Sequence, residues 1–180
     1  SLKTTFVPIP DDLAIVVCDT RADRSLAESA YNQRLEECGR SLEILRRRDP
    51  VTESLRDASP ALAEECRSEL GSVLHRRCRH VVTENARVGA LIDALNIDDR
   101  SAIGALMAQS HASLRDDYDV SSGELDAMVG AASGCPGFVA GRLTGAGFGG
   151  CTVNLVERPL IDEFAGEILV GSFIGILGRV

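Results

Sequence analysis

The most informative segment of this chain is Arg142-Leu143-Thr144-Gly145-Ala146-Gly147-Phe148-Gly149-Gly150-Cys151-Thr152-Val153-Asn154-Leu155-Val156. It is a glycine-dense loop that runs directly into a β-branched, apolar strand. Glycines this close together cost chain entropy, and a loop keeps them where the backbone needs a positive φ or where another group approaches closely. On spacing alone two interpretations stay open: a wide turn between two strands, or a loop against which another group binds.

The glycines fit neither common nucleotide-binding pattern. No Lys follows them, so the G-x-x-x-x-G-K-[ST] phosphate loop is excluded. Gly145-x-Gly147-x-x-Gly150 matches G-x-G-x-x-G in form, but a strand follows it where a dinucleotide-binding fingerprint requires a helix. The dinucleotide interpretation therefore fails on its context.

The segments around the loop predict an α+β order. The loop lies between expected strands at 138–143 and 151–156, and the apolar run 13–18 predicts an earlier strand. Helical periodicity predicts helices from about Ser25 to before Asp49-Pro50, from Pro60 to Cys66, from Leu74 to Leu95, around 103–114, and from Ser121 to near Gly134. Capping signals support three starts: Ser25 with Glu28, Ser59 before Pro60, and Ser121 with Glu124. A weak helix ends the order, which suits helices packed on one face of a small antiparallel sheet.

Length and charge exclude several classes of protein. The 180 residues suit one domain with a hydrophobic core, and no apolar run approaches the ~20 residues that span a bilayer. A formal net charge of −8 argues against a nucleic-acid surface, because phosphate backbones are held by clustered Lys and Arg. The one basic run, Arg46-Arg47-Arg48, ends an expected helix, where cations complement the helix dipole.

The six cysteines predict a reducing environment. They are spread through apolar segments without C-x-x-C spacing or a nearby pair of histidines. This distribution favours free thiols over disulfides or a zinc site. We therefore expect a cytoplasmic protein in which this chain holds no metal.

Taken as a whole string, the quoted stretch resembles the third signature of the GHMP small-molecule kinases, in the form found in galactokinases. Three further blocks resemble galactokinase segments in the family's order: Ser25–Arg34, Arg77–Val88 and Ser110–Ser121. The resemblance covers the chain from about Phe6 to Val156. It implies that residues 1–180 form the ferredoxin-like carboxy-terminal domain of GHMP kinases, enlarged by a helical insertion. It also implies a final strand near Leu169–Val180, where this sequence departs from the family pattern.

The strings that precede this part in galactokinases are missing. The chain has no P-x-x-x-G-L-x-S-S-A, no G-E-H-x-D-Y and no Gly-Gly-Met-Asp string, and it begins at Ser1-Leu2 rather than at Met. In the family those segments carry the phosphate loop, sugar contacts and the catalytic aspartate. We therefore expect the carboxy-terminal half of a kinase, with its amino-terminal half absent and no catalytic residue in this chain.

The activity that the resemblance implies is that of an ATP-dependent galactokinase. It would transfer the γ-phosphoryl group of ATP to the anomeric hydroxyl of D-galactose and give galactose 1-phosphate, with ATP and Mg²⁺ bound mainly by the missing half. A GHMP kinase for another sugar, such as N-acetylgalactosamine, and a non-catalytic sensor of sugar and ATP are the alternatives. The isolated chain is expected to be inactive and to expose the surface that faces its amino-terminal half, which favours self-association.

The resemblance places two parts of the site in this chain. Tyr31 lies where galactokinases carry a tyrosine whose hydroxyl faces the sugar. From its spacing to Leu35 and Cys38, it is alternatively an aromatic residue at the edge of the core. The third signature, beside the phosphate-binding elements of the family, supplies Gly145, Ala146, Gly147, Gly149 and Gly150. Phe148 is expected to pack against the protein, and Ala146, which replaces a glycine of many relatives, to be tolerated unless its φ is positive.

Polar clusters elsewhere predict structure rather than chemistry. His111 and Arg115 with 116–118 follow an apolar helix, as in a helix terminus held by hydrogen bonds and ion pairs. A metal or acid–base site is the alternative for this cluster, and the resemblance does not support it. His80 and Glu84 have the spacing of an i,i+4 pair on a helix.

Overall fold

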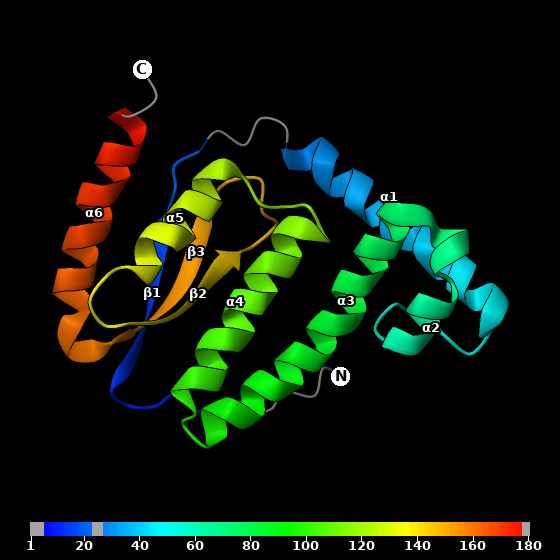
Figure 1. Cartoon of the computed structure of the whole chain (residues 1–180), viewed down its shortest axis with the longest axis horizontal. Coiled ribbons are helices and arrows are strands. Elements are labelled where there is room, and N and C mark those ends of the chain that lie inside the picture. The colour runs from blue at the N-terminus through cyan, green and yellow to red at the C-terminus, as the bar shows by residue number, and fades with distance from the viewer. Residues whose placement is uncertain (1–5, 23–26, 178–180) are drawn as a thin grey trace.

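The structure is a computed structural model that describes residues 6–22 and 27–177. In chain order its elements are β1 (Leu13–Asp19), α1 (Ala27–Arg48), α2 (Pro60–Glu65), α3 (Arg67–Asn96), α4 (Arg100–Asp116), α5 (Gly123–Ser133), β2 (Phe138–Thr144), β3 (Cys151–Glu157), the 3₁₀ turn η1 (Arg158–Leu160) and α6 (Ile161–Leu177). The predicted α+β order is confirmed, from the first strand through the paired strands beside the glycines (Figure 1).

The three strands form one antiparallel sheet in the order β1-β3-β2. In the middle strand, Cys151 pairs with Asp19 on β1 and with Thr144 on β2. The glycine loop, residues 145–150, therefore leaves the sheet where β2 and β3 meet and lies next to the end of β1. A register shift between Phe138 and Ala140 marks an irregularity at the other end of β2.

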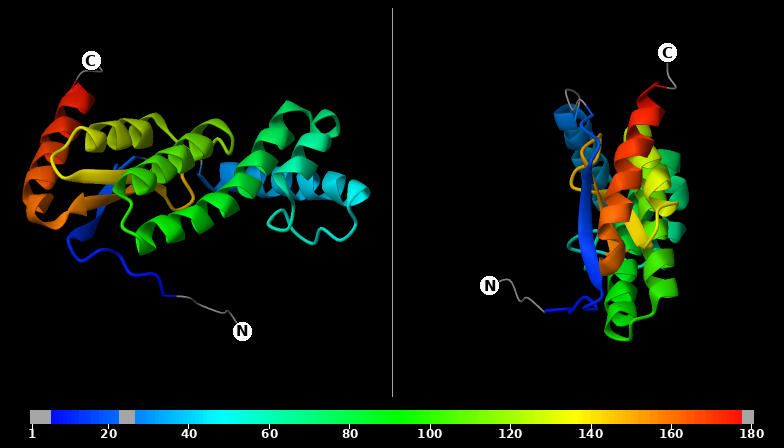
Figure 2. Two further views of the ribbon diagram at one scale, coloured as in Figure 1. Left: turned by 60° about the horizontal axis from the view of Figure 1, so that its bottom comes forward. Right: turned by 90° about the vertical axis from the view of Figure 1, so that its left-hand side faces the viewer.

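The two faces of the sheet are covered differently. Val156 of β3 is buried with Phe164 of α6 and Met128 of α5, so these helices cover one face, as Figure 2 shows. Adjacent strand residues point to opposite faces, and Leu155 packs instead with Ile103 of α4. The helices thus cover one face, as predicted, and α4 also closes part of the other. Ile15 and Val17 of β1, which we call the open face, remain 54% and 60% exposed.

The predicted helical insertion forms a separate layer beside the sheet. Its core joins α1, α2 and α3 through Leu45, Ala63, Leu70, Leu74 and Cys78. Within α3, Gly71 has a φ of 65°, so the chain bends there between two helical segments. A left-handed φ is inexpensive only for a glycine, which explains the residue at this bend.

Helix starts follow the predicted chemistry with one correction. Ser59 caps α2, since its Oγ accepts a hydrogen bond from the Leu62 N–H at 3.1 Å, and Pro60 follows. At α5 the prediction of Ser121 was wrong by one residue, because Ser122 accepts the Leu125 N–H while Ser121 Oγ donates to Asp126 at 2.6 Å. The expected cap at Ser25 lies outside the described residues.

The end of the chain differs from the family pattern. A strand was expected near Leu169–Val180, but α6 continues as a helix to Leu177, and 178–180 lie outside the described residues. The physical reason is spacing: Phe164 and Ile168 are four residues apart, both buried, and both packed against Val156. Among the described helices, none has the length and apolarity to cross a bilayer.

Candidate functional site

The glycine loop needs its glycines for backbone conformation. Gly145, Gly147, Gly149 and Gly150 have φ values of 80°, 82°, 102° and 94°, which side chains disfavour. Ala146 is not among the described residues with positive φ, so the methyl group that replaces a family glycine is accommodated. The prediction that the loop keeps glycines for positive φ is confirmed.

Two hydrogen-bonded contacts hold the loop to neighbouring segments. Beyond β1, Thr20 donates its N–H to Gly150 O at 2.7 Å, and its Oγ1 accepts the Gly150 N–H at 3.1 Å. Before α5, Val120 O accepts the Phe148 N–H at 2.7 Å. A Cβ on Gly147 would lie 2.1 Å from that same Val120 oxygen. Gly147 is therefore required both by its φ and by a close backbone approach.

The loop has a packed side and an exposed side. Phe148 packs against Leu114, Val120 and Leu143, as predicted, although its own φ is 56°. Gly145 and Ala146 are exposed at the other side. Among the described residues, no group accepts a hydrogen bond from the backbone N–H of 145, 146 or 147. Unpaired N–H groups at exposed positions such as Gly145 and Ala146 can bind an anion.

Tyr31 lies near the start of α1 and is 52% exposed. The alternative interpretation of Tyr31, an aromatic residue at the edge of the core, has no support on this part of α1, because Leu35 is 62% exposed and the apolar contacts of α1 begin only at Cys38. One turn after Tyr31, the guanidinium carbon of Arg34 lies 6.0 Å from the centre of the Phe148 ring. The structure thus brings the first turns of α1 close to the glycine loop.

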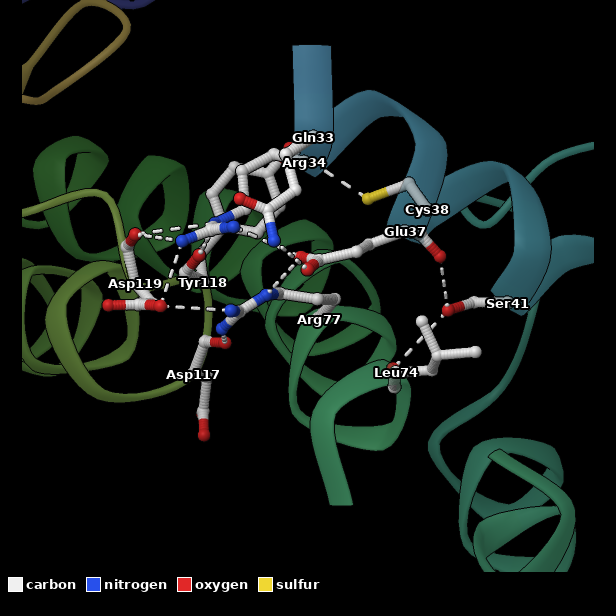
Figure 3. Close-up of polar contacts among 10 residues, drawn as sticks. All are labelled: Gln33, Arg34, Glu37, Cys38, Ser41, Leu74, Arg77, Asp117, Tyr118 and Asp119. Atoms are coloured by element: carbon white, nitrogen blue, oxygen red, sulfur yellow. Dashed lines mark hydrogen bonds and ion pairs between the residues drawn. The ribbon is translucent and has the colours of Figure 1, made fainter. Parts of the chain in front are cut away.

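An ion cluster joins these parts, and sequence reasoning missed it. Its two arginines and its glutamate are buried, whereas the side chain of Asp119 is 57% exposed. It consists of Arg34 and Glu37 on α1, Arg77 on α3, and Asp119 between α4 and α5 (Figure 3). Glu37 accepts hydrogen bonds from Arg77 Nε at 2.7 Å and from Arg34 Nη1 at 3.2 Å. Arg77 also donates to Asp117 O and to the Asp119 carboxylate. Two cations and two carboxylates balance, which is the condition for charges to be buried.

The cluster had a partial signal in the sequence. Arg34, Glu37 and Ser41 are all buried and lie on one face of α1, at spacings of three and four. Hydrophobic periodicity considers only apolar residues, so a polar stripe is assigned to solvent. The partners lie far along the chain at Arg77 and Asp119, and no local pattern connects them to Arg34 and Glu37.

The histidines are structural, and one prediction about them needs correction. His80 does not pair with Glu84: its Nδ1 lies 3.0 Å from Ser113 Oγ, and its ring stacks on Tyr118 with centroids 4.6 Å apart. Burial lowers the pKa of His80 to about 4, so the ring is neutral at pH 7. Glu84 is instead bound by Arg87 and Arg142.

The cluster that includes His111 and Arg115 lies in the last turns of α4 and at its C-terminal end, the helix terminus that was predicted. His111 Nδ1 accepts the Leu143 N–H at 3.3 Å, and its other ring nitrogen lies 3.3 Å from Asp126. The first contact satisfies an N–H of the edge strand β2 directly before the glycine loop. Burial lowers the pKa of His111, and the nearby Asp126 opposes this only in part. Exposed Arg115 pairs with Asp116.

Neither of two hollows in the structure includes a predicted site residue. One lies between α3 and α4 and is lined by Arg79, Arg87 and Asp117, among others, while the second surrounds Gly71 and His75. The described residues hold no group of three or more His, Cys, Asp or Glu side chains arranged for a metal. Gly145, Ala146 and Tyr31 are exposed and lie outside both hollows.

Comparison with known proteins agrees with this arrangement. Residues 91–167 match the family model described as GHMP kinases C terminal. The galactokinase of Roseiflexus sp. (strain RS-1) is 46% identical over 162 residues, which are 90% of this chain and 41% of that protein. The galactokinase of Chloroflexus aggregans is 44% identical over 168 residues, covering 93% of this chain and 43% of that protein. The chain spans less than half the length of these curated relatives.

A solved structure extends the match to the fold. The crystal structure of Lactococcus lactis galactokinase complexed with galactose has a TM-score of 0.88 and 33% sequence identity. The match covers 99% of this chain and 46% of that chain. The glycine loop, the three-stranded sheet and these matches agree: residues 91–167 match the C-terminal domain of the GHMP kinases, and nearly the whole chain is similar to the carboxy-terminal part of galactokinases.

Proposed function

We propose that this chain is the carboxy-terminal part of an ATP-dependent galactokinase that phosphorylates the anomeric hydroxyl of D-galactose. The observation that carries the proposal is the fold match over 99% of the chain to a galactokinase complexed with galactose. Phosphoryl transfer requires an in-line arrangement of nucleophile and γ-phosphate and stabilisation of charge on the phosphate. In this proposal the catalytic aspartate, the phosphate loop, ATP and Mg²⁺ belong mainly to the amino-terminal part.

The glycine loop would support the phosphate side of the cleft. Its exposed N–H groups at Gly145 and Ala146 suit the neighbourhood of a polyphosphate, and they compensate for an acidic chain with a net charge of −8. The net charge of the chain does not attract an anionic nucleotide, so its phosphates must be bound by local backbone N–H groups and a metal ion. We assign the loop a supporting role rather than a catalytic one.

Tyr31 would provide a hydroxyl to the sugar. Tyr31 is exposed and lies one turn before Arg34, which faces the Phe148 ring. This position supports a role for Tyr31 in the cleft shared with the amino-terminal part. Tyr118, the other tyrosine, is enclosed by His80 and Cys38 and is not available to a ligand. The two tyrosines therefore form a natural pair for a test.

The amino-terminal part of the same kinase is the partner that we propose. More than half the length of the curated relatives lies outside the region matched here. The open face, Ile15 and Val17, is an apolar strand surface of the kind that a neighbouring domain covers. Without that domain the chain is expected to self-associate through exposed apolar surface and to lack activity. We also propose a cytoplasmic location, since all six cysteines are free thiols.

A coupled assay of ATP consumption with galactose tests the proposal. The chain alone should be inactive, because it lacks the base and the phosphate loop, each worth several kcal/mol of barrier. Mixed with a separately expressed amino-terminal half, it should turn over. Activity of the pure chain would contradict the proposal. An associated but inactive mixture would favour the sensor, and a preference for N-acetylgalactosamine would favour the other sugar kinase.

Tyr31→Phe in the active mixture tests the sugar contact. Loss of one hydrogen bond is worth about 1 kcal/mol, so the KM for galactose should rise about fivefold. Tyr118→Phe is the matched control, since it also removes one hydroxyl, and it should leave that KM unchanged. Equal KM values for wild type and Tyr31→Phe would remove Tyr31 from the sugar site.

A further inference from the structure

Arg34 is an arginine directed at backbone rather than at solvent. The residue is 7% exposed, and its Nε donates to Tyr118 O at 2.8 Å. Its Nη2 donates to both Asp119 O and the Asp119 carboxylate, each at 2.8 Å. The remaining nitrogen, Nη1, reaches Glu37 at 3.2 Å. The planar fork thus binds two successive main-chain carbonyls at once, which a lysine cannot do.

The backbone that Arg34 holds is the backbone that holds the glycine loop. Val120 directly follows the two carbonyls, and its own oxygen accepts the Phe148 N–H at 2.7 Å. The same oxygen leaves no space for a side chain at Gly147. A shift of the 118–120 turn would therefore move the loop, because the hydrogen bond from Phe148 and the close approach of Gly147 both involve the Val120 carbonyl oxygen.

Asp119 and Phe148, the two residues that Arg34 approaches, both have strained backbone conformations. Asp119 has a φ of 58° and Phe148 a φ of 56°, which makes them two of the four described non-glycine residues with positive φ. Such conformations persist only where surrounding structure holds them, and they gather at functional sites. Arg34 binds the carbonyl and carboxylate of Asp119 and lies 6.0 Å from the Phe148 ring. It is therefore the common neighbour of both.

We propose that Arg34 is a positioning residue that sets the glycine loop against α1. Because Tyr31 lies one turn earlier on the same helix, Arg34 fixes the sugar side of the cleft relative to the phosphate side. The sugar and phosphate sides of the cleft rest on the proposed function. The coupling of Arg34 to the glycine loop does not depend on that function and can be measured on this chain. The test is designed to separate the two.

Hydrogen exchange on the whole chain measures the coupling directly. The variants are Arg34→Gln, Arg34→Lys and, as matched control, Arg46→Gln. Arg46 also donates to two main-chain carbonyls, Thr52 O and Glu53 O, but at the far end of α1. Peptide 144–151 contains the Phe148 amide, and peptide 62–70 reports on the distal core.

Both Arg34 variants should accelerate exchange in 144–151 by about tenfold while 62–70 stays within twofold, because local opening of the turn exposes the loop alone. Arg46→Gln should leave 144–151 unchanged. Unchanged loop exchange in either Arg34 variant, or equal acceleration in both peptides, would overturn the proposal and make Arg34 a general stabiliser. If Arg34→Gln loses its helical circular dichroism, the decision rests on Arg34→Lys, which keeps the charge that Glu37 needs.

Kinetics on the reassembled kinase complete the test. Arg34→Lys should lower kcat about tenfold with the KM for ATP within threefold, since misplacement of a site element costs rate more than binding. In the double variant Arg34→Lys/Tyr31→Phe, the factor by which kcat/KM for galactose falls should be smaller than the product of the two single-variant factors. A factor equal to that product would contradict the coupling. If the wild-type mixture is inactive, the proposed function fails while the exchange result still decides the role of Arg34.

Discussion

The two ends of helix α1 are held in opposite ways. Its distal half, around Leu42 and Leu45, packs into an apolar core with α2 and α3. Its first half buries Arg34 and Glu37 in a charged cluster beside the glycine loop. One helix thus passes from an ionic environment to an apolar one within its length.

The difference separates stability from position. Apolar burial is non-directional and tolerates small shifts, so it stabilises the helix without fixing one arrangement. Charge-assisted hydrogen bonds have defined lengths and directions, and they are costly when broken. The chain uses apolar contacts away from the candidate site and directional contacts next to it, where tenths of an ångström matter.

The largest effect is expected from breaking the ionic end. Arg77→Met removes the cation that bridges Glu37, Asp117 O and Asp119, and it leaves the buried Glu37 with Arg34 as its one paired cation and Gln33 as a neutral hydrogen-bond donor. The free energy of unfolding should fall by about 4 kcal/mol, measured by urea denaturation. Its exposed neighbour is the control, and Arg76→Met should change it by less than about 0.5 kcal/mol. Equal values for the two variants would mean that the cluster is not stabilised by its charges.

A substitution at the apolar end of α1 should lower the free energy of unfolding by less, and it should leave the glycine loop unaffected. Leu45 is fully buried, and Leu45→Ala should lower the free energy of unfolding by about 3 kcal/mol through lost burial and a cavity. Leu35→Ala, an exposed leucine on the same helix, should cost less than about 1 kcal/mol. Exchange of peptide 144–151 should remain as in the wild type for conditions that keep both proteins folded. Loop exchange that rises with Leu45→Ala would erase the distinction between the two ends.

A smaller effect is expected with pH. His80, which stacks on Tyr118 beside the ionic cluster, has its pKa lowered by burial from 6.5 to about 4. The unfolded chain therefore binds more protons between these values, so stability is complete above pH 6.5 and is lost as pH falls toward 4. From pH 7 to pH 5 the loss due to this group should be about 2 kcal/mol. His80→Gln should flatten the profile by that amount, and identical slopes would contradict the assignment.

Much of this fold is predictable because it depends on local signals. The strand at 13–18, the start of α2 at Ser59-Pro60 and the end of α1 before Asp49-Pro50 follow from apolar runs and capping chemistry. The glycine loop is equally local, since four positive φ values require four glycines. In each case neighbouring residues carry the information.

The rest depends on contacts between distant residues. Arg34 binds Asp119 and Glu37 binds Arg77, and nothing near these residues in the sequence indicates their partners. The exposure of Leu35 was missed for a similar reason, because a helical stripe does not reveal whether a neighbour covers it. The one-residue error at Ser121 arose because two adjacent serines compete for one cap, and Asp126 engages the first.

The pairing of β1 with β3 has a consequence for how the protein is made. Leu13 pairs with Glu157, so β1 leaves the ribosome well before β3, the strand with which it pairs in the described sheet. The helices of the insertion are made between the two strands and depend on nearer contacts. Because long loops close late and local contacts form early, we expect the helical layer to assemble first and the sheet last. During that interval Leu13 and its apolar neighbours in β1 lack the cover that β3 gives, so we expect β1 to be a segment that chaperones bind during synthesis.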